Sequence, residues 1–583
     1  MPPDASLLAF VHDLRHQIAQ ESDHARQQVK KIWNAPLPER VKQGKAIQGA
    51  RVASFTGQWA NLDLPDHEAL FREGDLLIWT ENGNPSLERR AELVLEEERD
   101  GHFLCRIRKG KELLPMGAVG VLDFGFADLS DQLNQALDKA LESTKGREKI
   151  LPLLEGNGPA PTFDPGKEEE ARKLAKQEGL NEAQTDALAF SWSTDLAFLV
   201  QGPPGTGKTA VLSLLACMAA RAGLRVLVTG LTHRGIDNAM AAIHRSDSLL
   251  NVARIGAPYA RNIGVPTWDN FTECPWADTS DGFIVGATPY CLQNARLGGI
   301  EFDFALFDEA SQVTLPLAIM GMNGAKRWIF FGDHQQLPPV LPTLEGRDLL
   351  AASVFGRLID RDFDQMLDVT YRLCDTLCRW PSETFYQGKL VASESAARRR
   401  LRLNQTSRHD LCAQALDPAI PLVHLDLEDA QATSSSSLEA DWTARLVERA
   451  LQGGVPASEI AVVTPFRRQN RLIRNRLSRI PGAQSVAVDT VERMQGQERD
   501  LVIVSLTSGN DAFVERLAEF YFQPQRLNVA ATRARSKLIL VGRGDWSELF
   551  ERRHDLEGHG QNLSNLLTRA HRLSPMQEST WQS

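Results

Sequence analysis

A glycine-rich segment, GPPGTGKT at residues 202–209, has the composition and spacing of a phosphate-binding loop. It fits the pattern G-x-x-x-x-G-K-[ST] and lies between a strand-like apolar run and a helical one. Glycine lets backbone N–H groups turn toward phosphate oxygens, Lys208 supplies a positive charge, and the Thr209 hydroxyl can ligate Mg²⁺. We therefore expect this segment to bind ATP with Mg²⁺. The residues expected to contact the nucleotide are Gly202, Pro203, Gly205, Thr206, Gly207, Lys208 and Thr209.

Two adjacent carboxylates follow a second apolar run about a hundred residues later, in FALFDEASQ at 304–312. Acidic pairs usually belong to a solvated surface, but these directly follow a strand of a phosphate-loop fold. Asp308 is expected to hold Mg²⁺ through water, and Glu309 to orient and deprotonate the attacking water. A carboxylate at position 309 favours hydrolysis over binding alone.

Two later motifs add groups that could act on the γ-phosphate. FGDHQQLPPV (331–340) brings Asp333 and Gln336 to the end of a predicted strand. RLNVAATRAR (526–535) precedes the last strand-like run and carries Arg533, a candidate arginine finger.

Two other segments provide further candidate contacts to the nucleotide. VDTVERMQGQERD (488–500) contributes Gln495, Gly496 and Glu498 between two predicted strands. Gln184, just upstream of the phosphate loop, has an amide suited to the edge of an adenine ring.

Apolar runs that alternate with helical segments must position these groups, as in a parallel α/β fold. Five runs could form one sheet: 197–201, 225–230, 283–288, 304–309 and 327–332. Four more could form a second sheet: 421–427, 459–465, 500–506 and 537–542. The fold class is therefore predicted as α/β, with two tandem phosphate-loop domains.

The first 150 residues have a different pattern. Leu7, Val11, Leu14 and Ile18 form an apolar stripe at helical spacing, and short β-type runs follow between about 51 and 126. A Pro- and Gly-rich stretch at 152–168 predicts a linker. The predicted divisions are a stalk helix (1–45), a β-barrel (46–128), a second stalk helix (129–150), a linker (151–178), a first α/β domain (179–348), a second (349–573) and a tail (574–583).

Taken together and in order, these motifs resemble the superfamily 1 helicases. They resemble specifically the 5′→3′ group, which includes the nonsense-mediated-decay helicase and the immunoglobulin-mu-binding helicase. The resemblance rests on DEASQ, GDHQQLPP, TYRL at 370–373, TPF at 464–466, QGQE and RLNVAATRAR. It covers nearly the whole chain.

The resemblance implies a β-barrel carried on stalk helices, two RecA-like domains, and ATP bound between those two domains. It also implies that Arg372 and Arg533 reach from the second domain to the γ-phosphate. The residues expected in catalysis are Lys208, Asp308, Glu309, Gln336, Arg372 and Arg533. Leu231 and His233 depart from the usual text of the family, which leaves the preference between DNA and RNA open.

A groove that tracks a single strand needs phosphate donors and stacking surfaces. The candidate nucleic-acid contacts are Thr232, His233, Thr288, Pro289, Tyr290, Thr464, Pro465, Phe466, Arg467 and Thr490. Tyr290 and Phe466 could equally be core aromatics. Arginines cluster at 398–402 and 467–479, and much of the second cluster could be a solvated helix face.

Composition sets limits on the class of protein. With 65 Lys and Arg against 75 Asp and Glu, the net charge of −10 excludes a uniformly basic, histone-like binder but allows a confined basic channel. No apolar run is long enough to span a membrane. The seven scattered cysteines suit a reducing cytoplasm, and the thiols of Cys374 and Cys378 are expected in the core rather than on zinc.

The predicted function is ATP-driven 5′→3′ movement on single-stranded DNA or RNA by a monomer. Two alternatives stay open at this level. The chain could displace bound proteins without productive unwinding, or it could be a nucleotide-gated clamp on nucleic acid.

Overall fold

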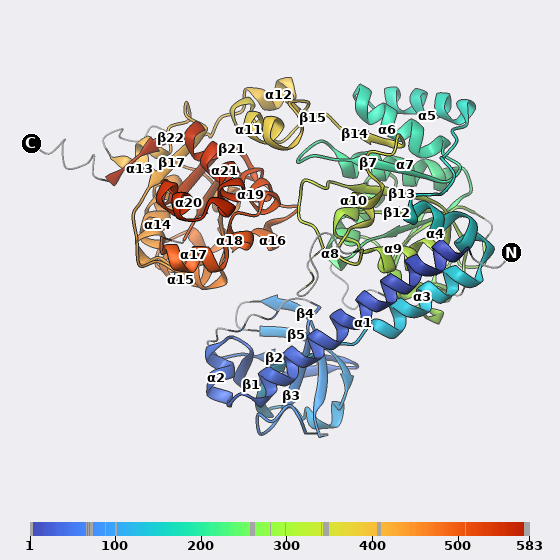
Figure 1. Cartoon of the computed structure of the whole chain (residues 1–583), viewed down its shortest axis with the longest axis horizontal. Helices are drawn as coiled ribbons and strands as arrows, with labels where there is room; N and C mark the ends of the chain where they lie inside the picture. The colour runs from blue at the N-terminus through green and yellow to red at the C-terminus, as the bar shows by residue number, and fades with distance from the viewer. Residues whose placement is uncertain are drawn as a thin grey trace, which may run out of the picture.

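The computed structural model has three lobes, and a long N-terminal helix joins two of them (Figure 1). It describes residues 4–65, 67, 69, 71, 74–87, 89–99, 102–256, 263–279, 281–297, 299–339, 341, 349–404, 410–507 and 509–575. A β-barrel forms one lobe, and two α/β domains with parallel sheets form the others. The predicted fold class is confirmed.

The first helix, α1 (Ala5–Asn34), runs from the barrel to the first α/β domain, with α3 (Ser130–Glu142) beside it (Figure 1). The apolar stripe predicted for α1 is buried in the same core as the first α/β domain. Arg15 of α1 also pairs with Asp138 of α3. Both helices are therefore anchored to the first domain.

The barrel is closed, with strand order β1-β2-β5-β4-β3-β6 and antiparallel pairing throughout. Helix α2 (Leu37–Lys42) is tied to it by Arg40, which forms a buried ion pair of 2.8 Å with Asp123. The strands are β1 (Ala46–Thr56), β2 (Trp59–Asp63), β3 (Leu76–Thr80), β4 (Ala91–Arg99), β5 (His102–Lys109) and β6 (Val119–Phe124).

The first α/β domain contains a parallel sheet of order β10-β9-β11-β8-β12-β13-β7-β14. Its strands are β7 (Ala197–Gln201), β8 (Arg225–Thr229), β9 (Asn251–Ile255), β10 (Thr267–Trp268), β11 (Phe283–Gly286), β12 (Phe302–Phe307), β13 (Ala325–Gly332) and β14 (Asp364–Met366). Its helices include α4 (Leu151–Glu155), α5 (Pro165–Gln177), α6 (Glu182–Ser193), α7 (Lys208–Arg221), α8 (His233–Ser246), α9 (Leu315–Met322) and α10 (Val354–Leu358). All five predicted strands of the first sheet lie within it.

The second α/β domain contains a parallel sheet of order β19-β18-β20-β21-β17-β22. Its strands are β17 (Leu422–Asp426), β18 (Ile460–Thr464), β19 (Ala487–Thr490), β20 (Arg499–Ser505), β21 (Ala534–Gly542) and β22 (His571–Leu573), and β15 (Val369–Thr370) pairs separately with β16 (Val391–Ala392). Its helices include α11 (Asp375–Phe385), α12 (Glu394–Ala397), α13 (Leu411–Ala415), α14 (Ser437–Gln452), α15 (Arg467–Leu477), α16 (Val491–Met494), α17 (Asp511–Arg516), α18 (Ala518–Tyr521), α19 (Pro524–Ala531), α20 (Ser547–Arg552) and α21 (His554–Arg569).

Two of the predicted segment boundaries differ from the structure. The predicted linker (151–178) contains the whole of α4 and α5, and α5 begins at Pro165 with the side chain of Asp164 as its N-cap. The first domain extends past residue 348, because β14 pairs with β7 and Phe355 and Leu367 lie in the first core.

Glu439 of α14 lies fully buried at the carboxyl end of the second sheet. Its carboxylate accepts hydrogen bonds from Ser505 Oγ (2.7 Å) and from the Thr507 N–H (2.8 Å). Burial raises its pKa from the ordinary 4.5 to about 8 despite these bonds. The folded chain therefore holds a proton that the unfolded chain releases, and stability falls as the pH rises between these two values.

We expect the thermal unfolding midpoint to fall between about pH 5 and about pH 8, and Glu439→Gln to flatten this dependence. Each tenfold difference in proton affinity is about 1.4 kcal/mol, so the effect on the free energy of unfolding is a few kcal/mol. Glu301→Gln, at an exposed carboxylate, is the matched control. An unchanged pH dependence in Glu439→Gln would contradict the assignment.

Within the part of the chain that the structure describes, no helix is both long and apolar enough to cross a membrane. The thiols of Cys374 and Cys378 are buried in the second domain, as predicted.

Candidate active site

The phosphate-binding loop, residues 202–207, connects β7 to the start of α7. Gly205 and Gly207 have positive φ angles of 76° and 83°, a conformation that favours glycine. The Gly202 N–H donates to the carbonyl of Gly332 at the end of β13 (2.8 Å). The loop is thus held at the carboxyl edge of the sheet, with the N-terminus of α7 directed at the site.

Lys208, at the start of α7, contacts both predicted acidic residues. Its Nζ lies 3.0 Å from Glu309 Oε1 and 3.8 Å from Asp308 Oδ1. Burial raises the pKa of Asp308 to about 6, while the Lys208 ammonium holds the pKa of Glu309 below its ordinary value against the effect of burial. Glu309 is therefore ionised at neutral pH, as its predicted role as a general base requires.

The backbone at Glu309 has a positive φ angle of 51°, which is uncommon for any residue but glycine. Strained backbone of this kind occurs preferentially at functional sites. Here it turns the chain immediately after Asp308, so that the two neighbouring carboxylates take different positions around Lys208.

Mg²⁺ prefers hard oxygen donors and usually keeps several waters and substrate phosphate oxygens in its shell. The Asp308 carboxylate and the Thr209 hydroxyl supply donors of this kind, so the residues fit the predicted ion. Among the described residues, no group of three or more His, Cys, Asp or Glu could hold a metal without other ligands. A Mg²⁺ ion here would therefore need the phosphates to complete its coordination.

Gln184 supports the phosphate loop from helix α6. Its Nε2 donates to the Thr206 carbonyl (2.9 Å), and its Oε1 accepts from the Asn181 N–H in a capping box. Both ends of the amide are thus engaged by the protein. Contact with an adenine edge stays a prediction.

The TYRL segment joins the second domain directly to the phosphate loop. Thr370 Oγ1 donates to the Pro204 carbonyl (2.7 Å), and the Tyr371 N–H donates to the Gly205 carbonyl (2.8 Å). A Cβ atom at Gly205 would lie only 2.3 Å from the Cβ of Arg372. Only glycine fits here, since the two backbones approach so closely.

Arg372 is held beside the loop by groups of the second domain. Its Nε donates to Glu498 Oε2 (2.5 Å), and its Nη1 donates to the Thr532 carbonyl (3.2 Å). Arg372 and Glu498 thus lie together, next to the phosphate loop.

Arg533 is buried within its own domain. Its Nε donates to the Val529 carbonyl (2.8 Å) and its Nη1 to the Gln497 carbonyl (3.2 Å). Burial lowers its pKa to about 9, and the neighbouring Arg372 acts in the same direction. Arg533 is therefore still protonated at neutral pH, and a finger role requires its side chain to leave these carbonyls.

Gln495 also crosses between the domains, since its Nε2 donates to Glu309 Oε2 (3.3 Å). The backbone turns sharply just after it, where Gly496 has a φ angle of 76°. Glu309, the predicted general base, therefore has partners in both domains.

Asp333 and Gln336 lie together in the loop after β13, with Gln336 Nε2 donating to Asp333 Oδ2 (2.8 Å). Their partners in the second domain, Tyr386 and Asn528, are not among the predicted site residues, although Asn528 lies within the RLNVAATRAR motif. Motif spacing cannot identify such residues, because only the folded chain brings them to Asp333.

In the first domain, two of the predicted nucleic-acid contacts follow β8. Thr232 is exposed and caps helix α8 through its hydroxyl oxygen. The buried Arg254 donates to His233 Nδ1 (2.8 Å), which leaves Nε2 as the protonated nitrogen of a neutral ring. The Thr232 hydroxyl, which accepts a hydrogen bond in this cap, can still donate its own proton to a phosphate.

The group after β11 is less accessible. Pro289 is buried, and Tyr290 packs against the first core, where burial raises its pKa to about 12. Thr288 is half-buried and lies 3.6 Å from the Cys291 thiol. Pro289 is therefore a correction to the predicted set, since a buried ring cannot contact a strand.

Thr464 and Thr490 of the second domain are also corrections. Thr464 is fully buried, and its hydroxyl bonds to the Phe466 carbonyl (2.8 Å) and to Asn470 (2.9 Å). Thr490 is buried at the start of α16. Both residues shape the loops that follow their strands and do not form a surface.

The half-buried Phe466 stacks on Phe520, with ring centroids 5.7 Å apart, next to the half-buried Pro465. Arg467 donates to the Phe71 carbonyl of the barrel (2.7 Å), and Arg493 pairs with Glu98 of β4 (2.8 Å). The barrel thus touches the second domain beside the predicted strand contacts.

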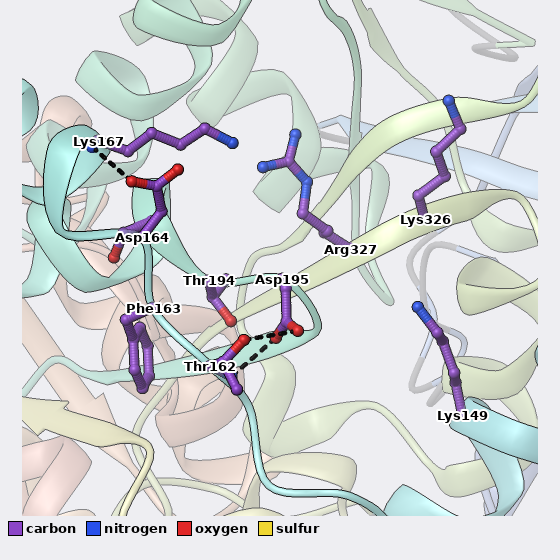
Figure 2. A pocket seen from close by; sticks show the side chains of 10 residues that line it. Lys149, Thr162, Phe163, Asp164, Lys167, Thr194, Asp195, Lys326 and Arg327 are labelled. Atoms are coloured by element: carbon purple, nitrogen blue, oxygen red, sulfur yellow. Dashed lines mark hydrogen bonds between the residues drawn. The ribbon is translucent and has the colours of Figure 1, made fainter.

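A cavity of about 420 Å³ lies on the first domain near the amino ends of β7 and β13, the opposite edge of the sheet from the phosphate loop (Figure 2). Lys167 and Arg327 extend toward one another across it, and Asp195 bonds to Thr162 (Figure 2). Lys326 is engaged by Asp303 (2.9 Å). None of the predicted catalytic residues is among the residues that line this cavity.

Comparison with known proteins gives two AAA-domain matches, one to residues 179–271 and 280–343 and one to residues 350–545. The chain is 27% identical over 561 residues to the DNA replication ATP-dependent helicase/nuclease DNA2 of Gallus gallus, covering 90% of this chain and 53% of that protein. It is 28% identical over 428 residues to the DNA polymerase alpha-associated DNA helicase A of Schizosaccharomyces pombe, covering 62% of this chain and 63% of that protein. A crystal structure of arterivirus nonstructural protein 10 (helicase) covers 90% of this chain and 82% of that one, at 12% identity and a TM-score of 0.39.

The chain spans only part of the length of these relatives. The aligned region covers 37% of the DNA2 protein of Xenopus laevis and 53% of that of Gallus gallus.

Proposed function

The chain belongs to the superfamily 1 helicases, and from this premise we propose that it is an ATP-dependent 5′→3′ helicase or translocase on single-stranded DNA or RNA. The observation that carries the proposal is the contact of the phosphate loop and the general base with both α/β domains. Tyr371 meets the loop at Gly205, and Gln495 meets Glu309.

ATP hydrolysis at such a site changes the contacts between the domains. Lys208 now pairs with Glu309, and a triphosphate would compete for the same ammonium group. Glu309, released from Lys208, would then accept a proton from the attacking water. Mg²⁺ held by Thr209 and Asp308 would neutralise charge on the phosphates.

The two arginines of the second domain would complete the site. Arg372 already lies beside Gly205, and Arg533 would add a second positive charge as the cleft closes. A finger from the opposite domain makes hydrolysis depend on closure. Closure and reopening would move the grip of each domain along the strand.

The proposed path of the strand uses Thr232 and His233 on the first domain and Phe466 and Arg467 on the second. These side chains are exposed or half-buried, in contrast to Thr464 and Pro289. A backbone-directed path of this kind suits movement on any sequence. The proposal includes a monomeric state, which the resemblance implies, and a cytoplasmic location, which the sparse cysteines favour.

A duplex with a 5′ single-stranded overhang is expected to be opened faster than one with a 3′ overhang, since the proposed direction of movement is 5′→3′. Strand separation with DNA and RNA tracking strands, measured side by side with ATP hydrolysis, tests this. A preference for the 3′ overhang would overturn the polarity. Strand-stimulated hydrolysis without strand separation would identify a translocase that displaces proteins, and binding gated by ATP without turnover would identify a clamp.

A further inference from the structure

A buried chain of polar side chains joins the loop after β13 in the first domain to helix α19 in the second. Tyr386, just after α11, donates from its hydroxyl to Asp333 Oδ2 (2.7 Å). Asn528 of α19 donates from Nδ2 to the Tyr386 hydroxyl (3.0 Å) and to the Gln335 carbonyl (2.9 Å). All three side chains are buried.

The direction of these hydrogen bonds follows from the chemistry of the groups. A backbone carbonyl can only accept, so the contact with Gln335 requires Asn528 to present its NH₂ group. The same NH₂ group donates to the Tyr386 oxygen, and the phenol proton is then directed to Asp333. Burial raises the pKa of Tyr386 well above its ordinary value, so the phenol keeps this proton at neutral pH.

Asp333 connects this series of hydrogen-bonded side chains to the proposed nucleotide site. Its Oδ2 also accepts from Gln336 Nε2 (2.8 Å), and its Oδ1 accepts from Gln201 Nε2 (3.3 Å) at the end of β7. Tyr386 and Gln336 therefore share one carboxylate oxygen. Loss of the Tyr386 hydroxyl would free that oxygen and change the position of Gln336.

At the other end of this hydrogen-bonded series, Asn528 lies close in sequence to Arg533, the proposed arginine finger. Asn528 and Arg533 belong to the same short segment, in which Arg533 Nε donates to the Val529 carbonyl (2.8 Å). The Thr532 hydroxyl also donates to the Asn528 carbonyl (2.6 Å). The position of Asn528 thus determines the position of the backbone from which the Arg533 side chain extends.

We propose that Tyr386 and Asn528 are positioning residues that keep the Asp333–Gln336 loop in register with α19, so that the γ-phosphate contact and the arginine finger move together. This inference rests on the proposed function. Binding of a γ-phosphate at Gln336 would thereby change the position of the second domain, because Gln336 of the first domain and Tyr386 of the second both donate to the Asp333 carboxylate. The link lies apart from the TYRL contact with the phosphate loop.

Tyr386→Phe tests the link, since it removes one hydroxyl and keeps the ring in the second core. With saturating single-stranded DNA, kcat for ATP hydrolysis is expected to fall about 10- to 100-fold. The KM for ATP is expected to stay within about twofold, because the phosphate loop and Lys208 are untouched. Asn528→Ala is expected to give the same pattern.

The double variant is expected to be no worse than the more severe single variant, since both changes break one link. Tyr521→Phe is the matched control, because its hydroxyl donates to the Leu506 carbonyl (3.0 Å) of the same domain. We expect kcat within about twofold of wild type for this control. The thermal unfolding midpoint of each variant is measured alongside its kinetics. If Tyr386→Phe does not fold, Asn528→Ala is used to test the link.

Wild-type kcat in Tyr386→Phe, or multiplicative losses in the double variant, would overturn the inference. A larger KM for ATP with unchanged kcat would also overturn it, because it would indicate ground-state binding. Wild-type protein whose hydrolysis ignores single-stranded nucleic acid would instead contradict the proposed function.

Discussion

Glu309→Gln is expected to lower kcat for ATP hydrolysis by about 10²–10⁴-fold while ATP binding is retained. The amide keeps the shape of the side chain but cannot accept the proton of the attacking water. Binding persists because Lys208 loses a competing carboxylate partner at 3.0 Å and stays available to the phosphates. Steady-state hydrolysis together with binding of a fluorescent ATP analogue measures both quantities.

Glu301→Gln provides the matched control, because it makes the same change at an exposed carboxylate of the first domain that pairs with Lys145 (3.1 Å). Its kcat is expected to equal that of the wild type. Near-normal turnover in Glu309→Gln would remove Glu309 as the base.

Arg533→Ala is expected to lower kcat by as much as about 10³–10⁵-fold, the range known for arginine fingers. The reason is the loss of a positive charge that must meet the γ-phosphate in the closed cleft. Arg533→Lys is expected to recover only part of the rate, since an ammonium lacks the planar fork of a guanidinium. Single-turnover hydrolysis with the strand present separates this chemical effect from product release.

Arg569→Ala is a suitable control, because this arginine lies outside both arginine clusters and pairs with Glu383 (2.6 Å) on the surface of the same domain. It is expected to hydrolyse ATP at the wild-type rate. The buried position of Arg533 makes a stability measurement necessary alongside. A folded Arg533→Ala protein with normal turnover would show that Arg533 stays on its own carbonyls throughout the cycle.

The features that the sequence predicts well are local ones. The phosphate loop is contiguous, and its glycines, Lys208 and Thr209 need only one strand and one helix to position them. The central strands of both sheets are apolar runs, because parallel strands are covered on both faces. The barrel also follows from local alternation and turn residues.

The features that the sequence did not predict depend on segments far apart in the chain. Tyr386 meets Asp333 across 53 residues, and Gln495 meets Glu309 across 186. The edge strand β14 was missed because a short, polar run gives no apolar signal. The linker prediction failed where Asp164 and Pro165 begin a helix, since the same residue types also occur in loops.

The burial of each side chain also shows which of the predicted nucleic-acid contacts lie on the surface of the folded protein. Thr464 and Pro465 are adjacent in the TPF motif, yet Thr464 is fully buried while Pro465 is half-buried. Sequence types alone cannot make this distinction, because threonine is common both in caps and on surfaces. The arginine clusters suggest a confined basic groove. Arg467 contributes less to such a groove than its charge suggests, because it donates a hydrogen bond to the barrel.

Steady-state ATP hydrolysis with and without single-stranded nucleic acid, DNA and RNA in parallel, tests the central claim most directly. A site whose base and phosphate loop contact both domains should turn over faster when a strand holds those domains together. We predict a clear rise in kcat with at least one of the two nucleic acids, and its loss in Glu309→Gln. Hydrolysis that neither strand changes would contradict a nucleic-acid motor.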